Sequence, residues 1–237
     1  QLGIERYGDP PYNIYQPKLI AYSFDSPIVQ IACGRWHTIF LTQNGNIYGC
    51  GDKESGQLTG NYKKSLNPNA CTIHKIISNG DIKSVGCCSR TSYMLNCDNV
   101  LYCFGKNNEG QLCIRDRDTP QTYAPMKVLN GKQLNGFSCG HLHIGLLTHD
   151  NVVWMFGEND YFQCGSPFKG PCHDGKEIII KDEIIIGIKC GKSHNIIKTK
   201  NDNYYSFGSN EFSQLLLEDN NEKLVLKPTL ISKVYLQ

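Results

Sequence analysis

The stretch NGNIYGCGDKESGQL, residues 44–58, decides the fold because the chain repeats it three more times. The matching stretches are DNVLYCFGKNNEGQL (98–112), DNVVWMFGENDYFQC (150–164) and NDNYYSFGSNEFSQL (201–215). Each copy holds a glycine and, six residues later, a glutamine. The glycines are Gly51, Gly105, Gly157 and Gly208, and the glutamines are Gln57, Gln111, Gln163 and Gln214. Such recurrence at a fixed period is typical of a repeat protein.

A second block precedes each copy of the first. It reads CGRWHTIFLT from Cys33, CCSRTSYMLN from Cys87, CGHLHIGLLT from Cys139 and CGKSHNIIKT from Cys190. The first cysteines of successive blocks are 54, 52 and 51 residues apart. Three of the four blocks place a Cys four residues before a His, a spacing that in isolation suggests a metal site.

The recurrence argues against that metal site. A structural zinc ion needs four ligands that converge on one point, whereas the repeat puts each Cys and His pair in a different unit. We therefore predict that each cysteine ends a strand that faces the core. Each histidine should begin the next strand and anchor the turn before it, and no metal site is expected.

Within a unit, the apolar residues form short runs rich in Ile, Val, Tyr and Phe, broken by Gly, Asn and Asp, which predicts strands joined by turns. For the second unit the predicted strands are Thr72–Ile77, Ile82–Cys87, Ser92–Asn96 and Val100–Phe104. Polar dipeptides that tolerate positive φ predict two-residue hairpin turns between the third and fourth strands. These dipeptides are Asn44-Gly45, Asp98-Asn99, Asp150-Asn151 and Asn201-Asp202. Each unit should therefore form a four-stranded antiparallel sheet.

A four-stranded unit of about 50 residues is typical of a β-propeller blade. The repeated glycine should lie where the backbone is too crowded for a side chain, and the Gln and Leu of GQL should tie their loop to the next blade. The predicted fold class is all-β, with about four whole units plus an extra strand in a single domain over 1–237. The repeat blocks are 1–44 (incomplete), 45–98, 99–150, 151–201 and 202–237 (incomplete).

These two blocks at this period resemble the repeat of the regulator of chromosome condensation family, whose known fold is a seven-bladed β-propeller. The resemblance covers nearly the whole chain. It departs from the pattern at Cys88, Thr91, Phe162 and Ser213. The resemblance implies that the units form part of a seven-bladed ring, although a smaller closed ring stays open as an alternative.

Both ends of the sequence resemble parts of a unit. Gln1-Leu2-Gly3 matches the end of a GQL block, and residues 226–237 resemble residues 15–26. We therefore expect the chain to start and stop within units. Self-association would be one way to cover the open propeller edges that result.

Composition restricts the function. The 237 residues are 40% hydrophobic and 19% charged with a net charge of +2, which suits an ordinary globular chain and gives no global field for a polyanion. The twelve cysteines fall largely at repeat or strand positions, which indicates reduced thiols and a cytoplasmic or nuclear location. No phosphate-binding, zinc-protease or serine-hydrolase motif occurs, so we predict no catalytic residue and no cofactor.

Function on a propeller is expected on its rim loops. In the founding member of the family that the repeat resembles, the rim of the CGxxH loops binds a Ran-type small GTPase and ejects its nucleotide, using Asp and His residues and an inserted wedge. The matching loops here hold His but no carboxylate, and the near-constant period leaves no room for a wedge. We therefore predict a non-enzymatic module that binds a protein partner. The predicted contact residues are Arg35, Trp36, His37, Arg90, His141, His143, Lys192 and His194.

Two alternatives remain at this stage. One is a guanine-nucleotide exchange factor for a Ran-like or Rho-like small GTPase. The other is a reader of chromatin, nucleic acid or phosphoinositide that uses the basic residues of the same rim.

Overall fold

The structure is a computed structural model that describes residues 16–59, 72–78, 80–218 and 222–231. Its strands form four antiparallel sheets of four strands, each in chain order, which we call blades 1 to 4. Blade 1 contains β1 (Ile28–Cys33), β2 (His37–Thr42), β3 (Ile47–Gly51) and β4 (His74–Ile77). Blade 2 contains β5 (Ile82–Cys87), β6 (Thr91–Asn96), β7 (Leu101–Lys106) and β8 (Gln121–Lys127), followed by the short 3-10 helix η1 (Val128–Gly131). Blade 3 contains β9 (Leu134–Cys139), β10 (His143–Thr148), β11 (Val153–Gly157) and β12 (Cys172–Ile178). Blade 4 contains β13 (Ile185–Cys190), β14 (His194–Thr199), β15 (Tyr204–Ser209) and β16 (Leu224–Leu230).

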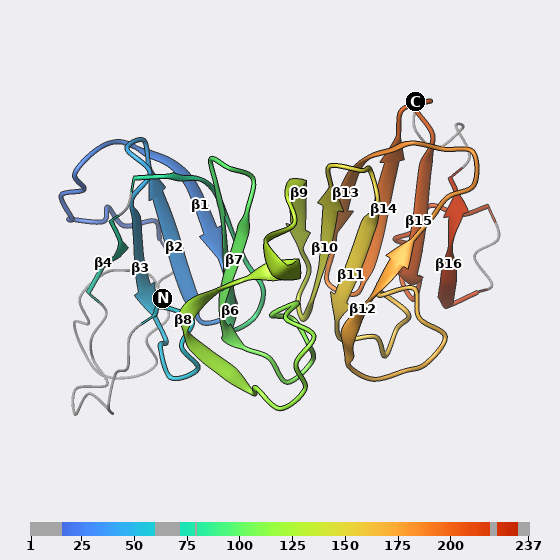
Figure 1. The fold of residues 1–237 in the computed structure, drawn as a ribbon, viewed down its shortest axis with the longest axis horizontal. Helices are drawn as coiled ribbons and strands as arrows, with labels where there is room; N and C mark the ends of the chain where they lie inside the picture. The colour runs from blue at the N-terminus through green and yellow to red at the C-terminus, as the bar shows by residue number, and fades with distance from the viewer. Residues whose placement is uncertain (1–15, 60–71, 79, 219–221, 232–237) are drawn as a thin grey trace.

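The four sheets stand side by side in chain order (Figure 1). The first strands of successive blades contact one another, β1 with β5, β5 with β9 and β9 with β13. First strands therefore lie at the inner edges of the blades and fourth strands at the outer edges. This is the blade arrangement of a propeller, and it confirms the predicted all-β propeller of four-stranded blades. The predicted extra strand is not found in the described residues, where residues 226–230 belong to β16, the fourth strand of blade 4.

The hydrophobic core lies between the blades. One cluster joins Leu41 and Ile47 of blade 1 to Val85 and Phe104 of blade 2. Equivalent clusters join blade 2 to blade 3 and blade 3 to blade 4. Each large apolar side chain buried in this way stabilises the fold by about 1.5–3 kcal/mol, so each sheet is held by its neighbours.

The predicted grouping of strands in the second unit is wrong in one respect. The strand predicted at Thr72–Ile77 exists as β4, but β4 pairs with β3 in blade 1 and not with the strands that follow it. The chain returns antiparallel to β3 before it crosses to the next blade. Each sheet therefore begins with the strand that ends at the Cys of CGxxH and finishes with the strand after GQL. The predicted unit began one strand too early.

The hairpin turns have three residues, where two were predicted. In blade 1, Thr42 N donates to Asn46 O at 3.0 Å and Gly45 N donates to Thr42 O at 2.9 Å, which leaves residues 43–45 in the loop. Only the last loop residue has positive φ, which suits a type I turn followed by a left-handed residue. Those left-handed residues are Gly45, Asn99, Asn151 and Asp202. The predicted pairing of the two flanking strands is confirmed.

Residues before β1 pack on the outer face of blade 1. Ile20 and Phe24 contact the buried side chains of Phe40 and Tyr48, and the rings of Phe24 and Tyr48 lie 5.1 Å apart. The stretch that was matched to the end of a GQL block, Gln1-Leu2-Gly3, lies outside the described residues, as do residues 232–237. In the described part of the chain, no helix has the length and apolar character needed to cross a membrane.

Candidate functional site

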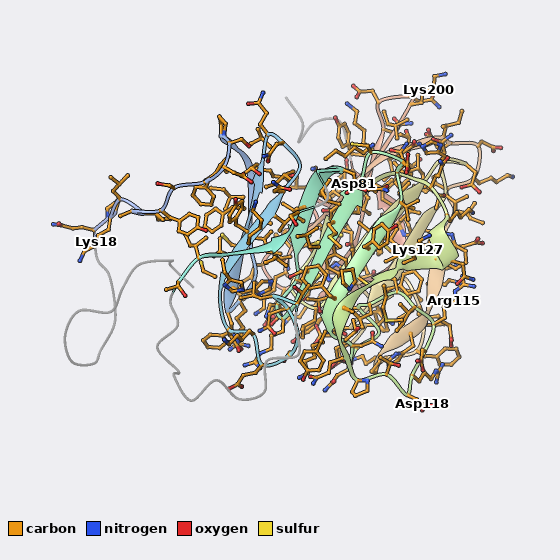
Figure 2. The ribbon with its side chains drawn as sticks, turned by 60° about the vertical axis from the view of Figure 1, so that its left-hand side comes forward. Lys18, Asp81, Arg115, Asp118, Lys127 and Lys200 are labelled. Atoms are coloured by element: carbon orange, nitrogen blue, oxygen red, sulfur yellow. The ribbon has the colours of Figure 1, made fainter. Side chains whose placement is uncertain are left out.

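Two loops of every blade lie on one edge of the propeller, which we call the loop rim. The first joins the first and second strands, and the second joins the third and fourth strands. Both end at the same edge because adjacent strands are antiparallel. This edge is at the bottom of Figure 1, and Figure 2 shows Asp118, from the second loop of blade 2, at the same edge while Asp81 and Lys200 lie at the opposite one.

The CGxxH sequence forms the first loop of each blade. As predicted, each repeated cysteine is the last residue of a strand, and each repeated histidine is the first residue of the next. The turn is closed by a backbone hydrogen bond from the residue after Cys to the His position, for example Gly34 N to His37 O at 2.9 Å. The two residues between them, such as Arg35 and Trp36, form the tip of the turn.

Backbone hydrogen bonds join the tips into a ladder that runs from blade to blade. Arg35 N donates to Ser89 O at 2.9 Å, Ser89 N donates to His141 O at 2.8 Å, and His141 N donates to Lys192 O at 3.3 Å. The four tips are therefore held side by side. Ser89 is buried at its tip, whereas Arg35 and Lys192 are exposed.

Two of the histidines link neighbouring blades. The Nε2 atom of His37 lies 2.9 Å from Ser92 Oγ, which donates to Gln57 O at 2.7 Å. In the same way, His143 Nε2 lies 2.8 Å from Asn195 Oδ1, and Asn195 Nδ2 donates to Gln163 O at 2.7 Å.

Both histidine rings are buried, so neither is part of the exposed surface of the site. His37 and His143 are both 0% exposed. Desolvation lowers the pKa of each imidazole to about 4, so both rings are neutral at physiological pH. Their prediction as partner contacts is wrong, because a fully buried ring cannot touch a partner. His194 begins β14 in the equivalent place but is half-buried, and burial lowers its pKa as well.

In the part of the chain that the structure describes, no group of three or more His, Cys, Asp or Glu side chains is placed to hold an ion. Cys33 is exposed on the face of blade 1, while Cys139 packs between blades 2 and 3, and Cys190 packs between blades 3 and 4. The three cysteines that precede a His therefore belong to different surfaces. Every described cysteine is a free thiol, as predicted.

Trp36 forms the most prominent cluster of the loop rim. Its side chain is 37% exposed, with the guanidinium of Arg35 at 5.1 Å from the ring and that of Arg90, from the next blade, at 5.9 Å. Arg90 also lies 3.5 Å from Asp52, so its position is fixed from both sides. The indole is thus presented to solvent between two cations, a cation–π arrangement that stabilises both the ring and the charges.

His141 and Lys192 continue the loop rim away from Trp36. Lys192 is exposed and His141 is partly exposed. Burial lowers the pKa of His141, and the nearby positive charges of Arg35 and Lys192 lower it further. The structure therefore brings together Arg35, Trp36, Arg90, His141 and Lys192, all predicted contact residues, along one ladder of loops.

The repeated glycines position the second loops against the first. Gly105, Gly157 and Gly208 all have φ between 109° and 115°, and a Cβ atom there would overlap a backbone carbonyl oxygen of the adjacent CGxxH loop. The residue after each glycine then donates to that loop, as Glu158 N does to Leu142 O at 2.9 Å. The predicted need for a bare backbone at this place is confirmed.

The tie to the next blade that was predicted for GQL is present, but the side chains of the repeated glutamines do not make it. Gln57 Oε1 accepts a hydrogen bond from Ser55 N at 2.9 Å, within its own loop, and the other three copies do the same. A side chain two residues from the donor closes a local turn more readily than it reaches another blade. The tie between blades runs instead through the backbone oxygens of Gln57 and Gln163, and through buried leucines such as Leu58 and Leu112.

Sequence reasoning missed three exposed aromatic side chains of the second loops. Tyr161 is 41% exposed, Phe168 is 80% exposed and Phe212 is 81% exposed. The signal was present, because Tyr161 and Phe212 stand where Ser55 stands in blade 1. An aromatic residue in a polar loop position has no role in the repeat.

Carboxylates also lie on the loop rim, outside the CGxxH tips. The pKa of Glu158 is raised, first by burial and then by the negative charges of Asp160 and Glu109. These three groups therefore form an acidic cluster near the junction of blades 2 and 3. The loop rim has both signs of charge.

Comparisons with known proteins agree with this architecture. The family model described as the regulator of chromosome condensation (RCC1) repeat matches residues 28–57. The human probable E3 ubiquitin-protein ligase HERC6 is 28% identical over 201 residues, which is 83% of this chain and 19% of that protein. The human probable ligase HERC3 is 26% identical and covers 86% of this chain, again across 19% of its own length. The ultraviolet-B receptor UVR8 of Arabidopsis thaliana is 26% identical over 91% of this chain and 48% of its own.

Solved structures show the same fold. Prp20p from Saccharomyces cerevisiae superimposes with a TM-score of 0.76 at 20% identity, over 90% of this chain and 52% of that one. Human WBSCR16 superimposes with a TM-score of 0.70 at 21% identity, over 89% of this chain and 54% of that one. The chain thus spans about a fifth of the length of the two ligases and about half of each solved structure.

Proposed function

Because the chain folds as propeller blades and residues 28–57 match the regulator of chromosome condensation repeat, we propose that it is a non-enzymatic interaction module whose loop rim binds a protein partner. A cytoplasmic or nuclear location is part of this proposal. The predicted self-association through blade edges is not needed for it.

The observation that carries the proposal is the exposed Trp36 held between Arg35 and Arg90. Trp, Tyr and Arg are the residue types that dominate binding energy in protein interfaces. Tyr161 and Phe212 add exposed aromatic surface on the same edge of the propeller. A backbone ladder and ion pairs hold the tips in place, so little side-chain entropy has to be lost on binding.

The charge pattern favours a protein over a polyanion. Nucleic acid or a phosphoinositide surface would require basic groups without nearby carboxylates. Here Glu109, Glu158 and Asp160 lie on the same rim as Lys192 and His141. A surface of both signs next to aromatic anchors complements the mixed surface of a protein.

The similar proteins indicate which partners to test first. Prp20p from Saccharomyces cerevisiae has binding properties to Gsp1p and histones, so a Gsp1-type small GTPase and core histones are suitable probes. The similar human proteins are named as ubiquitin ligases, and a protein-binding module would serve such an enzyme by holding its target. Exchange activity on a small GTPase is the second candidate function, which the likeness to Prp20p favours.

The test compares two variants with one exposed hydrophobic residue each. Trp36→Ala removes the centre of the proposed surface, while Ile179→Ser changes a residue that is 75% exposed on the loop between β12 and β13, at the opposite edge. Binding of the full chain to each probe is measured by calorimetry. For a probe that binds, we expect Trp36→Ala to weaken the dissociation constant by at least about tenfold and Ile179→Ser to leave it within about twofold.

Two results would contradict this assignment. Equal loss in both variants would show a general effect on folding, and loss in Ile179→Ser alone would place the interface on the other edge. Nucleotide release from the GTPase, followed in the same samples, separates the two functions: acceleration that Trp36→Ala abolishes would favour the exchange factor.

A further inference from the structure

Blade 3 differs from the other blades at two positions that touch. Cys164 stands where the other GQL blocks have Leu58, Leu112 and Leu215. Cys172 begins β12, opposite Gly157, and its counterpart opposite Gly208 in blade 4 is Val225. In blade 4, Leu215 and Val225 pack together in one hydrophobic cluster. The architecture therefore places these two positions in contact, and blade 3 fills both with thiols.

The sulfur atoms of Cys164 and Cys172 converge on the end of β11. Cys164 Sγ lies 3.3 Å from Glu158 O and 3.7 Å from Gly157 O, and Cys172 Sγ lies 3.8 Å from Met155 O. Both side chains belong to one hydrophobic cluster between blades 3 and 4, in which Cys172 packs against the buried residues that include Cys164. Their surroundings differ, because Cys164 is 0% exposed whereas Cys172 is only partly buried. This combination of an accessible thiol and a buried one in contact suits an attacking and a resolving cysteine.

We propose that Cys164 and Cys172 form an oxidation site, at which hydrogen peroxide converts the two thiols into a disulfide. The Cys172 thiolate attacks one peroxide oxygen; its S–O bond forms as the O–O bond breaks, and the departing hydroxide takes up a proton to become water. Cys164 then attacks the Cys172 sulfenic acid, giving up its own proton. The S–S bond forms as the S–O bond breaks, and a second water leaves. Two electrons pass from the thiols to the peroxide.

The local electrostatics favour Cys172 as the attacking group. Its pKa is lowered chiefly by the hydrogen bond from Cys164, against burial, with help from the backbone N–H of Gly175. A lowered thiol pKa increases the thiolate fraction that reacts with peroxide. Burial raises the pKa of Cys164 well above its usual value, so that thiol stays protonated until its neighbour is oxidised.

A second thiol contact in the molecule serves as an internal control. Cys139 packs against the cluster that contains Cys88, but burial raises the pKa of Cys139 well above its usual value. Two thiols are thus close together at both places, but the pKa of Cys139 is raised whereas the pKa of the partly buried Cys172 is lowered. Peroxide should discriminate between the two pairs.

Oxidation would act on the proposed binding surface. Residues 165–171 join the two cysteines and carry Phe168, which is 80% exposed on the loop rim. A disulfide would close this segment into a short covalent loop and restrict its conformations. The oxidation site itself does not depend on the proposed function.

The experiment uses the reduced full chain. It is exposed to equimolar hydrogen peroxide, remaining thiols are blocked with N-ethylmaleimide, and the protein is digested with trypsin under non-reducing conditions. Lys169 is the only Lys or Arg between the two cysteines, so trypsin separates them unless a disulfide holds their peptides together. We expect residues 133–169 joined to 170–176, with the mass of the two reduced peptides less two hydrogens. Tandem mass spectrometry assigns the link to Cys164 or to Cys139, the other cysteine of the larger peptide.

Two variants use residues that the repeat already accepts. Cys164→Leu copies Leu215, and Cys172→Val copies Val225, so both should keep the folded circular dichroism spectrum. Cys164→Leu should lose the linked peptide and leave Cys172 as a sulfenic acid that dimedone labels. Cys172→Val should lose the link and leave Cys164 as an unoxidised thiol. Cys139→Ala should retain the link.

Several outcomes would overturn the proposal. One is recovery of Cys172 as a maleimide adduct in a sample where exposed Cys97 is already oxidised. Another is a linked peptide that survives in Cys164→Leu, which would assign the bond to Cys139. A third is loss of the Cys172 thiol no faster than loss of the exposed Cys97 thiol when the parent chain is treated with peroxide, which would remove any special reactivity.

Discussion

Replacement of the two buried histidines should remove much of the sensitivity of the fold to mild acid. His37 and His143 are enclosed between blades with pKa values of about 4, while an unfolded histidine titrates near about 6.5. The unfolded chain therefore binds more protons than the native chain at any pH below that value. Stability is complete above about pH 6.5, falls as the pH drops and reaches its full loss near about pH 4.

The magnitude follows from the size of the shift. Linkage gives a loss of roughly 2 kcal/mol per histidine by about pH 5 and roughly 3 kcal/mol by about pH 4. For both rings the loss by about pH 5 is roughly 4 kcal/mol, a large part of the 5–15 kcal/mol that typically stabilises a folded protein. Burial also lowers the pKa of His74, His141 and His194, and these groups add to the loss in the same direction. Carboxylates with lowered pKa, such as Asp116, lose their contribution only at a lower pH.

The measurement is urea unfolding of the full chain, followed by circular dichroism at several values from about pH 7.5 to about pH 5. The double variant His37→Gln, His143→Gln retains a side chain that can bond to Ser92 and Asn195 but cannot titrate. It should be less stable than the parent at the upper pH by about 1–2 kcal/mol and lose roughly 4 kcal/mol less on acidification. Parallel pH profiles for parent and variant would refute the assignment of acid sensitivity to these rings.

Two further predictions concern the backbone of the repeat. Gly157→Ala should lower the free energy of unfolding by more than about 2 kcal/mol, because φ is 113° and the new Cβ would overlap Leu142 O. The control Gly136→Ala, where a new Cβ would have nothing within 4 Å, should change it by less than about 1 kcal/mol. Similar losses in the two variants would contradict the crowding argument. Ser213→Gly should raise the free energy of unfolding by up to about 1 kcal/mol in urea titrations, because the exposed Ser213 has φ 58° at the place of Gly56 and Gly110. A loss of stability would show instead that the serine side chain stabilises its turn.

The sequence was sufficient for the strands but not for the boundaries of the sheets. Strand ends at Cys87 and strand starts at His143 follow from the alternation of apolar runs and turns. A period by itself does not say where one sheet stops, because any cyclic shift of the four strands fits the same repeat. The strand at His74–Ile77 was therefore assigned to the wrong blade, and only the hydrogen bonds to β3 decide its place.

Burial at the loop rim was equally hard to predict, for a geometric reason. Trp36 and His37 are adjacent, yet one is 37% exposed and the other is 0% exposed. The first is at the tip of a turn and the second begins a strand, so their side chains point in opposite directions. Sequence reasoning placed both on the loop rim and could not separate them. Tyr161 and Phe212 occupy the same place in the repeat, but the other two copies have Ser55 and Glu109 there, so the shared pattern did not single out this position.

Some residues that depart from the repeat lie next to each other in space, and each change in such a pair explains the other. In three blades the Gly after Cys is needed because a Cβ there would overlap the following His ring, as at Gly34, Gly140 and Gly191. Blade 2 changes both positions together: Thr91 removes the ring and donates to Lys106 O at 2.8 Å, and Cys88 fills the space with its thiol 3.2 Å from His143 O.

Cys164 and Cys172 are a second compensated pair, in the places that Leu215 and Val225 occupy in blade 4. A compensated pair preserves packing and needs no partner to explain it, but it can introduce chemistry that the other blades lack. Phe212 also departs from the repeat, but it is exposed, has no paired change in a neighbouring residue and does not contribute to packing. Aromatic side chains are enriched at protein interfaces, which is why the proposed interface includes the exposed aromatics of the loop rim.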